Sequence, residues 1–223
     1  SSLVGSEMCI RDRIHVALYL RRQDLWLESW YNQNVKWPWD AEFSGSDIQY
    51  FIGKSKNFPW INYENLLGRI EEFVPLEKIH VRCIGEDNTT SSTDDFLSFC
   101  GIDSNLLQKE ADKNQSLSSA KIDILRRIDI IALPGPARLK VLGALSKIKI
   151  QEDSGNRAFL TRAERLKILA DFMESNDHVA RRYFGRNKLF SDKWSEELNP
   201  ALVSDMNAYQ RYIPEILKKI AEE

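Results

Sequence analysis

A short apolar run that ends in two arginines and leads into a helical pattern constrains this chain more than any other feature. Residues Ile14 to Leu20 are mostly β-branched or apolar, which predicts a buried strand, and Asp24 to Lys36 reads as a helix capped by Asp24. Arg21 and Arg22 fall between them. In α/β folds, anions bind where the C-terminal end of a strand leads into a helix, because free backbone N–H groups and the helix dipole point there. The segment therefore predicts an α/β fold with a phosphate-bearing ligand at this junction.

Two interpretations of the arginines stay open on this segment alone. Guanidinium groups are planar and permanently charged, and they suit phosphate oxygens. Arginines at strand ends are also often solvated, or paired with a nearby carboxylate such as that of Asp24. Ser29, one to two turns into the expected helix, is a further candidate ligand, although a serine on a helix commonly has no special role.

Six segments spread over most of the chain resemble segments of one enzyme family. They are Tyr19-Leu20-Arg21-Arg22-Gln23-Asp24, Glu28-Ser29-x-Tyr31-Asn32-Gln33, Lys78 to Glu86 as a strand, Asp95 to Ile102 as a helix closing on Gly101, Asn114-Gln115-Ser116-Leu117-Ser118, and Ser175-Asn176-x-x-Val179-Ala180-Arg181-Arg182-Tyr183. Together they resemble a bacterial group of sulfotransferase-like proteins that use 3′-phosphoadenosine 5′-phosphosulfate. The resemblance implies that Arg21 and Ser29 bind the 3′-phosphate of this donor, with Arg22 as an auxiliary or substitute. Gln23 departs from the family pattern, which often has proline there.

The same resemblance implies an incomplete three-layer P-loop-like parallel sheet with two or three strands retained, and a predominantly α-helical C-terminal half. The family's other cofactor loop, a glycine-rich turn with a lysine and a Ser or Thr, would precede Ile14, and its strand would lie between the two retained strands. Gly53-Lys54-Ser55 is a superficial match, but Ile48 stands where such a loop needs glycine, so we interpret the triplet as a helix end or loop. The catalytic residues are therefore unknown, and we expect this chain to be inactive by itself.

Residues 1 to 13 read as the in-frame translation of a sequencing adapter. They have neither the apolar stretch of a signal peptide nor a usable apolar helix face, so they are excluded from fold reasoning. We expect the native protein to begin upstream of Ile14 and to come from a bacterial, metagenomic source. The expected division is a disordered leader over 1–13, an α/β core over 14–118 and a helical extension over 119–223.

Local patterns predict the other elements. The expected elements are a short helix over Asp47–Ile52, a helix over Tyr63–Phe73 capped by Asn62, a strand over Lys78–Ile84, a polar loop over Glu86–Thr93, helices over Ala120–Leu133 and Arg138–Ile150, a helix opened by the capping box Thr161-x-x-Glu164, a helix over Asn176–Tyr183 with Gly185 as C-cap, and a final helix over Pro200–Tyr212 ended by Pro214. The basic pairs Arg126-Arg127 and Arg181-Arg182 could approach phosphates or lie on solvated helix faces.

Tryptophan is concentrated in one part of the chain, since five of the six lie between Trp26 and Trp60. Indole faces pack well against sugar rings, and Trp37, Trp39 and Trp60 are the candidates for an acceptor-binding surface because they lie in an irregular stretch. The alternative is that these rings cover the core beneath a long loop.

Composition excludes several classes of function. The net charge of −2 does not suit a general role with nucleic acid or at membrane surfaces, and no apolar run approaches the ~20 residues of a membrane span, so we expect a cytoplasmic protein. Cys83 and Cys100 are expected to be buried free thiols. The scattered histidines His15, His80 and His178 predict no metal site.

The favoured hypothesis is a fragment of an enzyme that transfers a sulfuryl group from 3′-phosphoadenosine 5′-phosphosulfate to a hydroxyl group of a carbohydrate or another acceptor. Two alternatives stay open: a non-catalytic helical domain that binds a partner, and a glycosyltransferase-like protein that uses a nucleotide sugar. A phosphate bound between Arg21, Arg22 and Ser29 would favour the enzyme, whereas an Asp24–arginine pair filling that space would favour the helical domain. The oligomeric state is not predicted.

Overall fold

The computed structural model describes residues 14–86, 91–103, 117–128, 130, 132–151, 157–191 and 209–222, which form two compact units. The first unit takes the described residues up to Gln23, from Lys56 to Ala111 and from Ile168 to Trp194. The second takes Asp24–Ser55 and the described residues from Asp112 to Lys167 and from Ser195 to Glu223. The leader lies outside the described residues, and the boundary expected at residue 118 stays a prediction.

The first unit is built on two parallel strands, β1 (Val16–Leu20) and β2 (Ile79–Cys83). They pair directly from Val16↔Ile79 to Leu20↔Cys83. This confirms, for the described residues, a small parallel sheet in a mostly helical chain. It contradicts the expected order, because the two strands are hydrogen-bonded to each other and leave no place for a third strand between them. A further strand could join this sheet at an outer edge.

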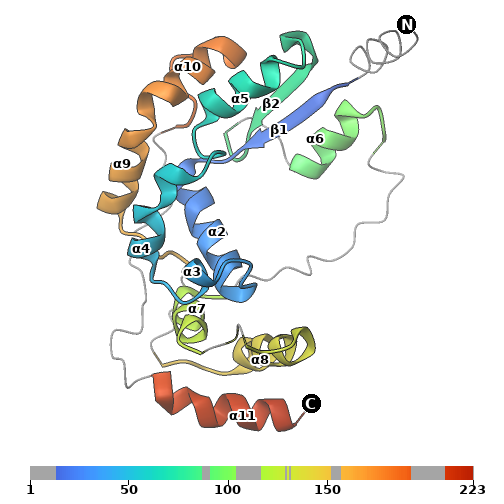
Figure 1. Ribbon diagram of the computed structural model, residues 1–223. Helices are drawn as coiled ribbons and strands as arrows, with labels where there is room; N and C mark the ends of the chain where they lie inside the picture. The colour runs from blue at the N-terminus through green and yellow to red at the C-terminus, as the bar shows by residue number, and fades with distance from the viewer. Residues whose placement is uncertain are drawn as a thin grey trace, which may run out of the picture. The chain divides into compact units, whose positions relative to one another are not determined.

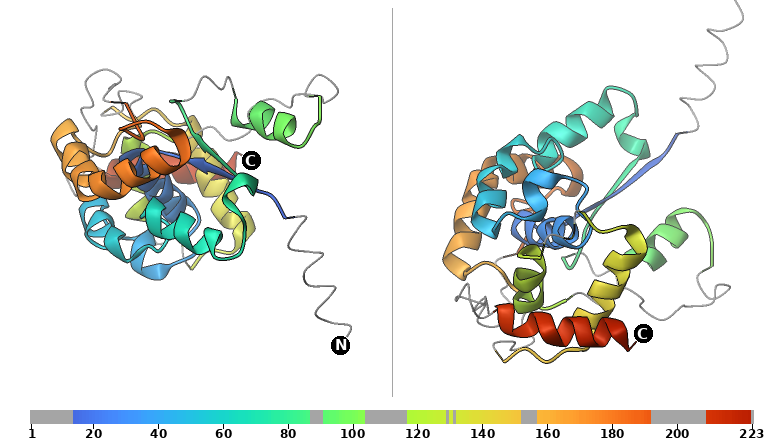
Figure 2. Two further views of the ribbon diagram at one scale, coloured as in Figure 1. Left: turned by 90° about the horizontal axis from the view of Figure 1, so that it is seen from above. Right: turned by 60° about the horizontal axis from the view of Figure 1, so that its bottom comes forward.

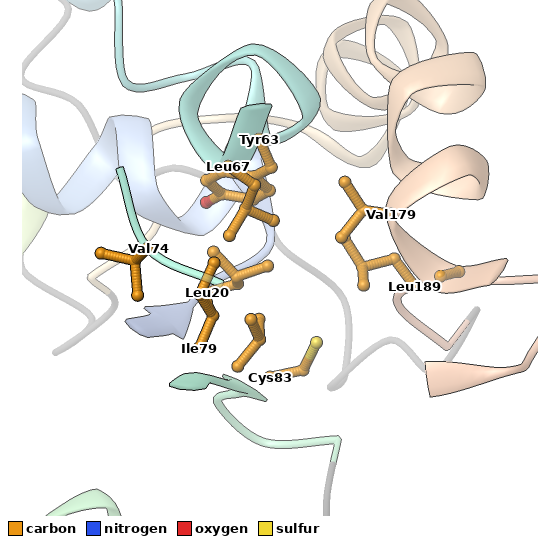
Figure 3. Close-up of a cluster of buried hydrophobic side chains, with 10 residues drawn as sticks. Leu20, Tyr63, Leu67, Val74, Ile79, Cys83, Val179 and Leu189 are labelled. Atoms are coloured by element: carbon orange, nitrogen blue, oxygen red, sulfur yellow. The ribbon is translucent and has the colours of Figure 1, made fainter. Parts of the chain in front are cut away.

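One face of the sheet forms the core of the first unit. Alternate side chains of both strands, ending at Leu20 and Cys83, pack with helices α5 (Tyr63–Glu71) and α10 (Met173–Phe184). Figure 3 shows Leu20, Tyr63, Leu67 and Val179 within this cluster. Helices α5 and α10 lie side by side, as Figure 1 shows. The period of two along each strand sends the remaining side chains to the opposite face.

That opposite face contacts helix α6 (Ser92–Phe99). The side-chain oxygen of Ser91 accepts hydrogen bonds from the backbone N–H groups of Thr93 and Asp94, so α6 begins within the loop predicted over Glu86–Thr93. At the other end of the helix Gly101 has φ of 73°, a conformation that glycine adopts readily. The first unit thus has helices on both faces of its sheet.

The helix ends of the first unit follow the predicted signals where those signals are local. Asn62 accepts from the N–H of Asn65 at 3.0 Å and caps α5, which ends at Glu71, two residues earlier than predicted. Gly185 has φ of 62° and terminates α10, also as predicted. Short 3-10 turns cover Ser55–Asn57 and Leu76–Lys78, the latter leading into β2.

The second unit is helical throughout its described elements. They are α2 (Gln23–Lys36, with Gln23 itself assigned to the first unit), α3 (Ala41–Ser44), α4 (Ile48–Gly53), α7 (Ser119–Arg126), α8 (Gly135–Lys147), α9 (Arg162–Asp171, which continues into the first unit), a 3-10 turn over Tyr209–Tyr212, and α11 (Ile213–Ala221). Figure 2 shows α8 and α11 next to each other. The short helix predicted over Asp47–Ile52 is α4, and Asp47 is its N-cap, with the Tyr50 N–H 2.8 Å from its carboxylate.

Gly53-Lys54-Ser55 is a helix end, in agreement with the interpretation from the sequence. Gly53 is the last residue of α4, Lys54 is its C-cap, and Ser55 opens a 3-10 turn. The Lys54 ammonium lies 3.3 Å from the Glu42 carboxylate. The triplet therefore does not form a phosphate-binding loop.

Prolines account for the main errors in predicted boundaries. Pro136 and Pro214 lie in the first turns of α8 and α11, whereas the predicted helices began only at Arg138 and ended before Pro214. Proline suits the first turn because its missing N–H would have no partner there and its φ is already helical. The predicted helix over Pro200–Tyr212 lies mostly outside the described residues, and its described end is a 3-10 turn.

Helix α7 is shorter than the predicted helix over Ala120–Leu133. Its last turn tightens, since the N–H groups of Arg127 and Ile128 bond to carbonyl groups three residues back. The cysteine prediction holds in part: both described cysteines are free, but Cys83 is buried whereas Cys100 is exposed.

Candidate functional site

The predicted phosphate-binding junction has the backbone path that the sequence indicated. Strand β1 ends at Leu20, and α2 begins at Gln23, so that Arg21 and Arg22 alone connect them. Arg21 is half-buried, and its carbonyl oxygen accepts a hydrogen bond from the hydroxyl of Tyr63. Arg22 is 8% exposed. Both arginines belong to the first unit.

Gln23 is held by a reciprocal pair of amide hydrogen bonds. Its Nε2 donates to Oδ1 of Asn176 at 2.7 Å, and Nδ2 of Asn176 donates back to Oε1 of Gln23 at 3.1 Å. Gln23 is fully buried, so the two side-chain amides hydrogen-bond to each other in place of water. Gln23 is therefore joined to α10 within the first unit, through a residue that is distant along the chain.

Asp24 is not the helix cap that the sequence suggested, because α2 already begins at Gln23. Its buried carboxylate instead accepts from Nη1 of Arg165 at 2.8 Å. Nη2 of the same guanidinium donates to Glu28 Oε2 at 2.5 Å. The other Glu28 oxygen accepts from the backbone N–H groups of Phe159 and Leu160 at 2.7 and 2.9 Å. The first two turns of α2 are thus fixed to α9 and the segment before it, all within the second unit.

This Arg165 network was missed in the sequence because its members are 137 and 141 residues apart. The available signal was the acidic pair at Asp24 and Glu28, four residues apart on one helix face. Burial raises the pKa of the Glu28 carboxyl, while Arg165 and the two backbone N–H groups oppose that rise. Nε of Arg165 is buried and makes no hydrogen bond.

Ser29 lies on α2 in the second unit and is half-buried. Its expected cooperation with Arg21 across the two units stays a prediction. Asp24 does pair with an arginine, Arg165, at 2.8 Å within the second unit. An Asp24–arginine pair is the kind of contact that was expected of the helical partner-binding alternative.

The three candidate tryptophans divide between the units. Trp39 is 65% exposed, and its ring lies 5.5 Å from that of Trp30, which in turn lies 5.5 Å from Trp26. Trp37 is half-buried in the same unit. Trp60, in the first unit, stacks on Phe58 with ring centroids 5.1 Å apart. Trp39 is therefore the candidate with the most ring area available for an acceptor.

The basic pairs on later helices are mostly engaged by carboxylates. Arg126 and Arg127 both bond to Asp123, at 2.6 and 3.1 Å. Arg182 makes a bidentate pair with Glu71, which also accepts from the Tyr183 hydroxyl. The donated hydrogen bonds from Arg182 lower the pKa of the Glu71 carboxyl. The Asp123 contacts therefore lie within α7 and its last turn, whereas the Arg182–Glu71 pair links α10 to α5 in the first unit.

A second polar cluster lies on the α6 face of the sheet, and sequence reasoning missed it. The Asp95 carboxylate accepts from the hydroxyl of Tyr19 at 2.6 Å and pairs with Nε2 of His80 at 3.1 Å and Nε of Arg82 at 3.2 Å. The His80 ring also stacks on Phe99, with centroids 4.6 Å apart. The signal in the sequence was the alternation of Tyr19, His80 and Arg82 with core residues along the two predicted strands.

Two hollows lie elsewhere in the described residues. A cavity of about 180 Å³ between α5 and α10 is lined in part by Leu67, Val179 and the Glu71–Arg182 pair. A larger groove of about 350 Å³ between α8 and α11 is apolar except for Lys140. The described part of the chain contains no cluster of three or more metal-ligating side chains. It also contains no helix with the length and hydropathy needed to cross a bilayer.

Comparison with known proteins gives one relative and no family assignment. A protein from the archaeon Archaeoglobus fulgidus, described as uncharacterized, is 35% identical over 182 residues. The match covers 78% of this chain and 47% of the relative, so the chain spans about half the relative's length. No protein-family model matches, and no solved structure matches. The relative is archaeal, and the bacterial source expected from the sequence stays a prediction.

Proposed function

We propose that this chain is part of a sulfotransferase-like enzyme that uses 3′-phosphoadenosine 5′-phosphosulfate, and that the junction of β1 and α2 binds the 3′-phosphate of this donor. The observation that carries the proposal is the direct passage from a parallel strand through Arg21 and Arg22 into the N-terminus of a 14-residue helix. Backbone N–H groups and the positive end of the helix dipole attract anions at such a point.

Electrostatics at the start of α2 also support the proposal. Asp24 in the first turn would repel a phosphate, but the guanidinium of Arg165 binds its carboxylate at 2.8 Å within the second unit. This pairing offsets the negative charge nearest the helix start. The guanidiniums of Arg21 and Arg22 then add two positive charges immediately before it.

The architecture of the first unit supports the finer part of the fold proposal. Helices α5 and α10 cover one face of the sheet, and α6 contacts the other. We propose that this is part of a three-layer, P-loop-like arrangement, with additional strands joining at an outer edge. Layers of this kind are the usual cover of a parallel sheet.

The transferred group would pass to a hydroxyl of a carbohydrate or a similar acceptor, and Trp39 offers the most exposed indole for stacking. Sulfuryl transfer also needs a base for the acceptor hydroxyl and positive charge at the bridging oxygen. The 223 residues contain no glycine-rich turn that ends in a lysine and a Ser or Thr. We therefore expect this chain to bind the nucleotide without turnover.

The test is calorimetric titration of the chain with 3′,5′-adenosine bisphosphate. We expect Arg21→Ala to weaken binding at least about tenfold, since a charge-assisted hydrogen bond contributes roughly 1.5–3 kcal/mol. Ser29→Ala should weaken it about threefold, as expected for a neutral hydrogen bond. Arg69→Ala, which removes an exposed arginine from α5, is the matched control and should leave the affinity unchanged.

A second ligand separates 3′-phosphate recognition from general anion binding. Adenosine 5′-monophosphate lacks the 3′-phosphate and should bind at least about tenfold more weakly than the bisphosphate. Equal affinity for the two nucleotides, or equal affinity of the wild type and Arg21→Ala, would contradict the proposal.

A further inference from the structure

The cluster on the α6 face of the sheet has the donor set of an anion site. Tyr19 and Arg82 are register partners on the two strands, and His80 lies two residues before Arg82 on the same face. Their hydroxyl, imidazole and guanidinium groups all converge on one carboxylate, that of Asp95. The paired strands fix the backbone positions from which these three groups project, and those positions do not depend on α6.

The element that supplies the carboxylate is weakly packed. Helix α6 has no buried residue, and its side chains Phe96 and Phe99 are 46% and 36% exposed. Its contacts with β1, β2 and the residue before β1 include the three to Asp95, the stacking of Phe99 on His80 and an edge contact between Phe99 and His15 at 6.3 Å. Little apolar burial would therefore be lost if α6 left this face.

The donors hold their anion firmly and remain close to solvent. The hydrogen bond from Tyr19 and those from His80 and Arg82 lower the pKa of the Asp95 carboxyl to about 2. The side chain of Arg82 is 39% exposed, and that of His80 is 19% exposed. An anion from solution could thus reach the guanidinium without passing through the core.

We propose that Tyr19, His80 and Arg82 form a binding site for a sulfate- or phosphate-type oxyanion, and that Asp95 occupies this site as a displaceable ligand from the same chain. A tetrahedral oxyanion offers oxygens to all three donors, as the two carboxylate oxygens of Asp95 do. Binding of the external anion releases α6 from the sheet. The site is separate from the β1–α2 junction, so this proposal does not depend on the proposed function.

The test compares Asp95→Ala with the wild type in sodium sulfate and in sodium chloride at equal ionic strength. We expect sulfate at about 50 mM to raise the melting temperature of Asp95→Ala by about 3–5 °C more than it raises that of the wild type. The comparison between variants removes the general stabilisation that sulfate gives to any folded protein. Asp94→Ala removes a charge from the same turn but keeps Asp95, and it should respond as the wild type does.

The double variant Asp95→Ala/Arg82→Gln locates the effect. It should lose the additional response to sulfate, whereas binding at the β1–α2 junction would survive this change. An equal response of Asp95→Ala and Asp94→Ala would overturn the proposal, as would a full response of the double variant. A merely structural ion pair predicts that Asp95→Ala is destabilised and that sulfate does not rescue it specifically.

Hydrogen exchange on the wild type gives a readout that needs no Asp95 variant. Sulfate should increase the exchange of α6 amides relative to chloride, and exchange in α5 should not change. Unchanged α6 exchange would overturn the displacement step even if Asp95→Ala failed to fold. Replacing inorganic sulfate by p-nitrophenyl sulfate then tells whether the site accepts a free ion alone or also a sulfate ester.

Discussion

Arg165 and Asp95 are two charged residues that differ in sign, in burial and in the number of their partners. Arg165 is one buried cation held by two carboxylates, whereas Asp95 is one anion held by three donors near the surface. The buried guanidinium loses its hydration and depends on its partners, while Asp95 can exchange its partners for water. We therefore expect the two sites to differ in how strongly substitution affects stability.

Replacing Arg165 by Met should destabilise the protein by about 3–5 kcal/mol, because Asp24 and Glu28 would be left as buried charges without their cation. Urea unfolding at pH 7 measures the change in the free energy of unfolding. The loss should become smaller as the pH falls, because the Glu28 carboxyl, whose pKa burial raises, then takes up a proton. Lys167→Met, at an exposed position on the same helix, is the control and should change stability by less than about 0.5 kcal/mol. Equal effects of the two substitutions would show that the Arg165 contacts contribute little.

The contribution of Asp95 to stability should depend on pH in a defined window. Its pKa falls from 3.8 to about 2 in the folded state, first because of the hydrogen bond from Tyr19. A depressed folded-state pKa stabilises the protein fully above the unfolded value, and this stabilisation is lost as the pH falls through the folded value. We expect Asp95→Asn to cost roughly 1–2 kcal/mol, less than the full shift implies because Arg82 is partly solvated.

The measurement is the free energy of unfolding of the wild type and Asp95→Asn between pH 7 and pH 2. The difference between them should be constant above about pH 5 and should shrink toward pH 2. A difference that stays constant over the whole range would contradict an ionised, paired Asp95 in the folded state.

At the scale of elements, the helix ends with local signals could be predicted and those with ambiguous signals could not. Asn62 and Gly185 act within a few residues of the backbone groups that they satisfy, and the structure has them in the predicted capping roles. Pro214 is an ambiguous signal, because proline occurs both just after the end of a helix and in the first turn of one. The structure uses it in the first turn of α11.

Two glycines on helices α5 and α10 should respond in opposite directions to alanine. Gly68 lies inside α5, and an added Cβ would meet no atom within 4 Å, so Gly68→Ala should stabilise by about 0.5–1 kcal/mol. Gly185 has φ of 62°, so Gly185→Ala should destabilise by about 1 kcal/mol. Thermal unfolding of both variants measures the two changes in stability. The same sign for both substitutions would contradict the backbone conformations described.

At the scale of the whole molecule, the two compact units draw on segments that are distant in the chain. Each unit combines residues from before and after position 118, through contacts such as Gln23 with Asn176 in the first and Glu28 with Arg165 in the second. Several large apolar side chains stay exposed, among them Phe73, Leu139, Met173 and Leu217.

The sequence by itself determined the strand at β1, the arginines after it, the helix that follows and the capping of several helices. These depend on side-chain periodicity and on hydrogen bonds between close neighbours. The direct pairing of β1 with β2, the partner of Asp24 and the convergence of Tyr19, His80 and Arg82 on Asp95 were decided by the tertiary structure. Each of these joins groups whose types are common and whose distance along the chain carries no signal, so folding alone brings them together.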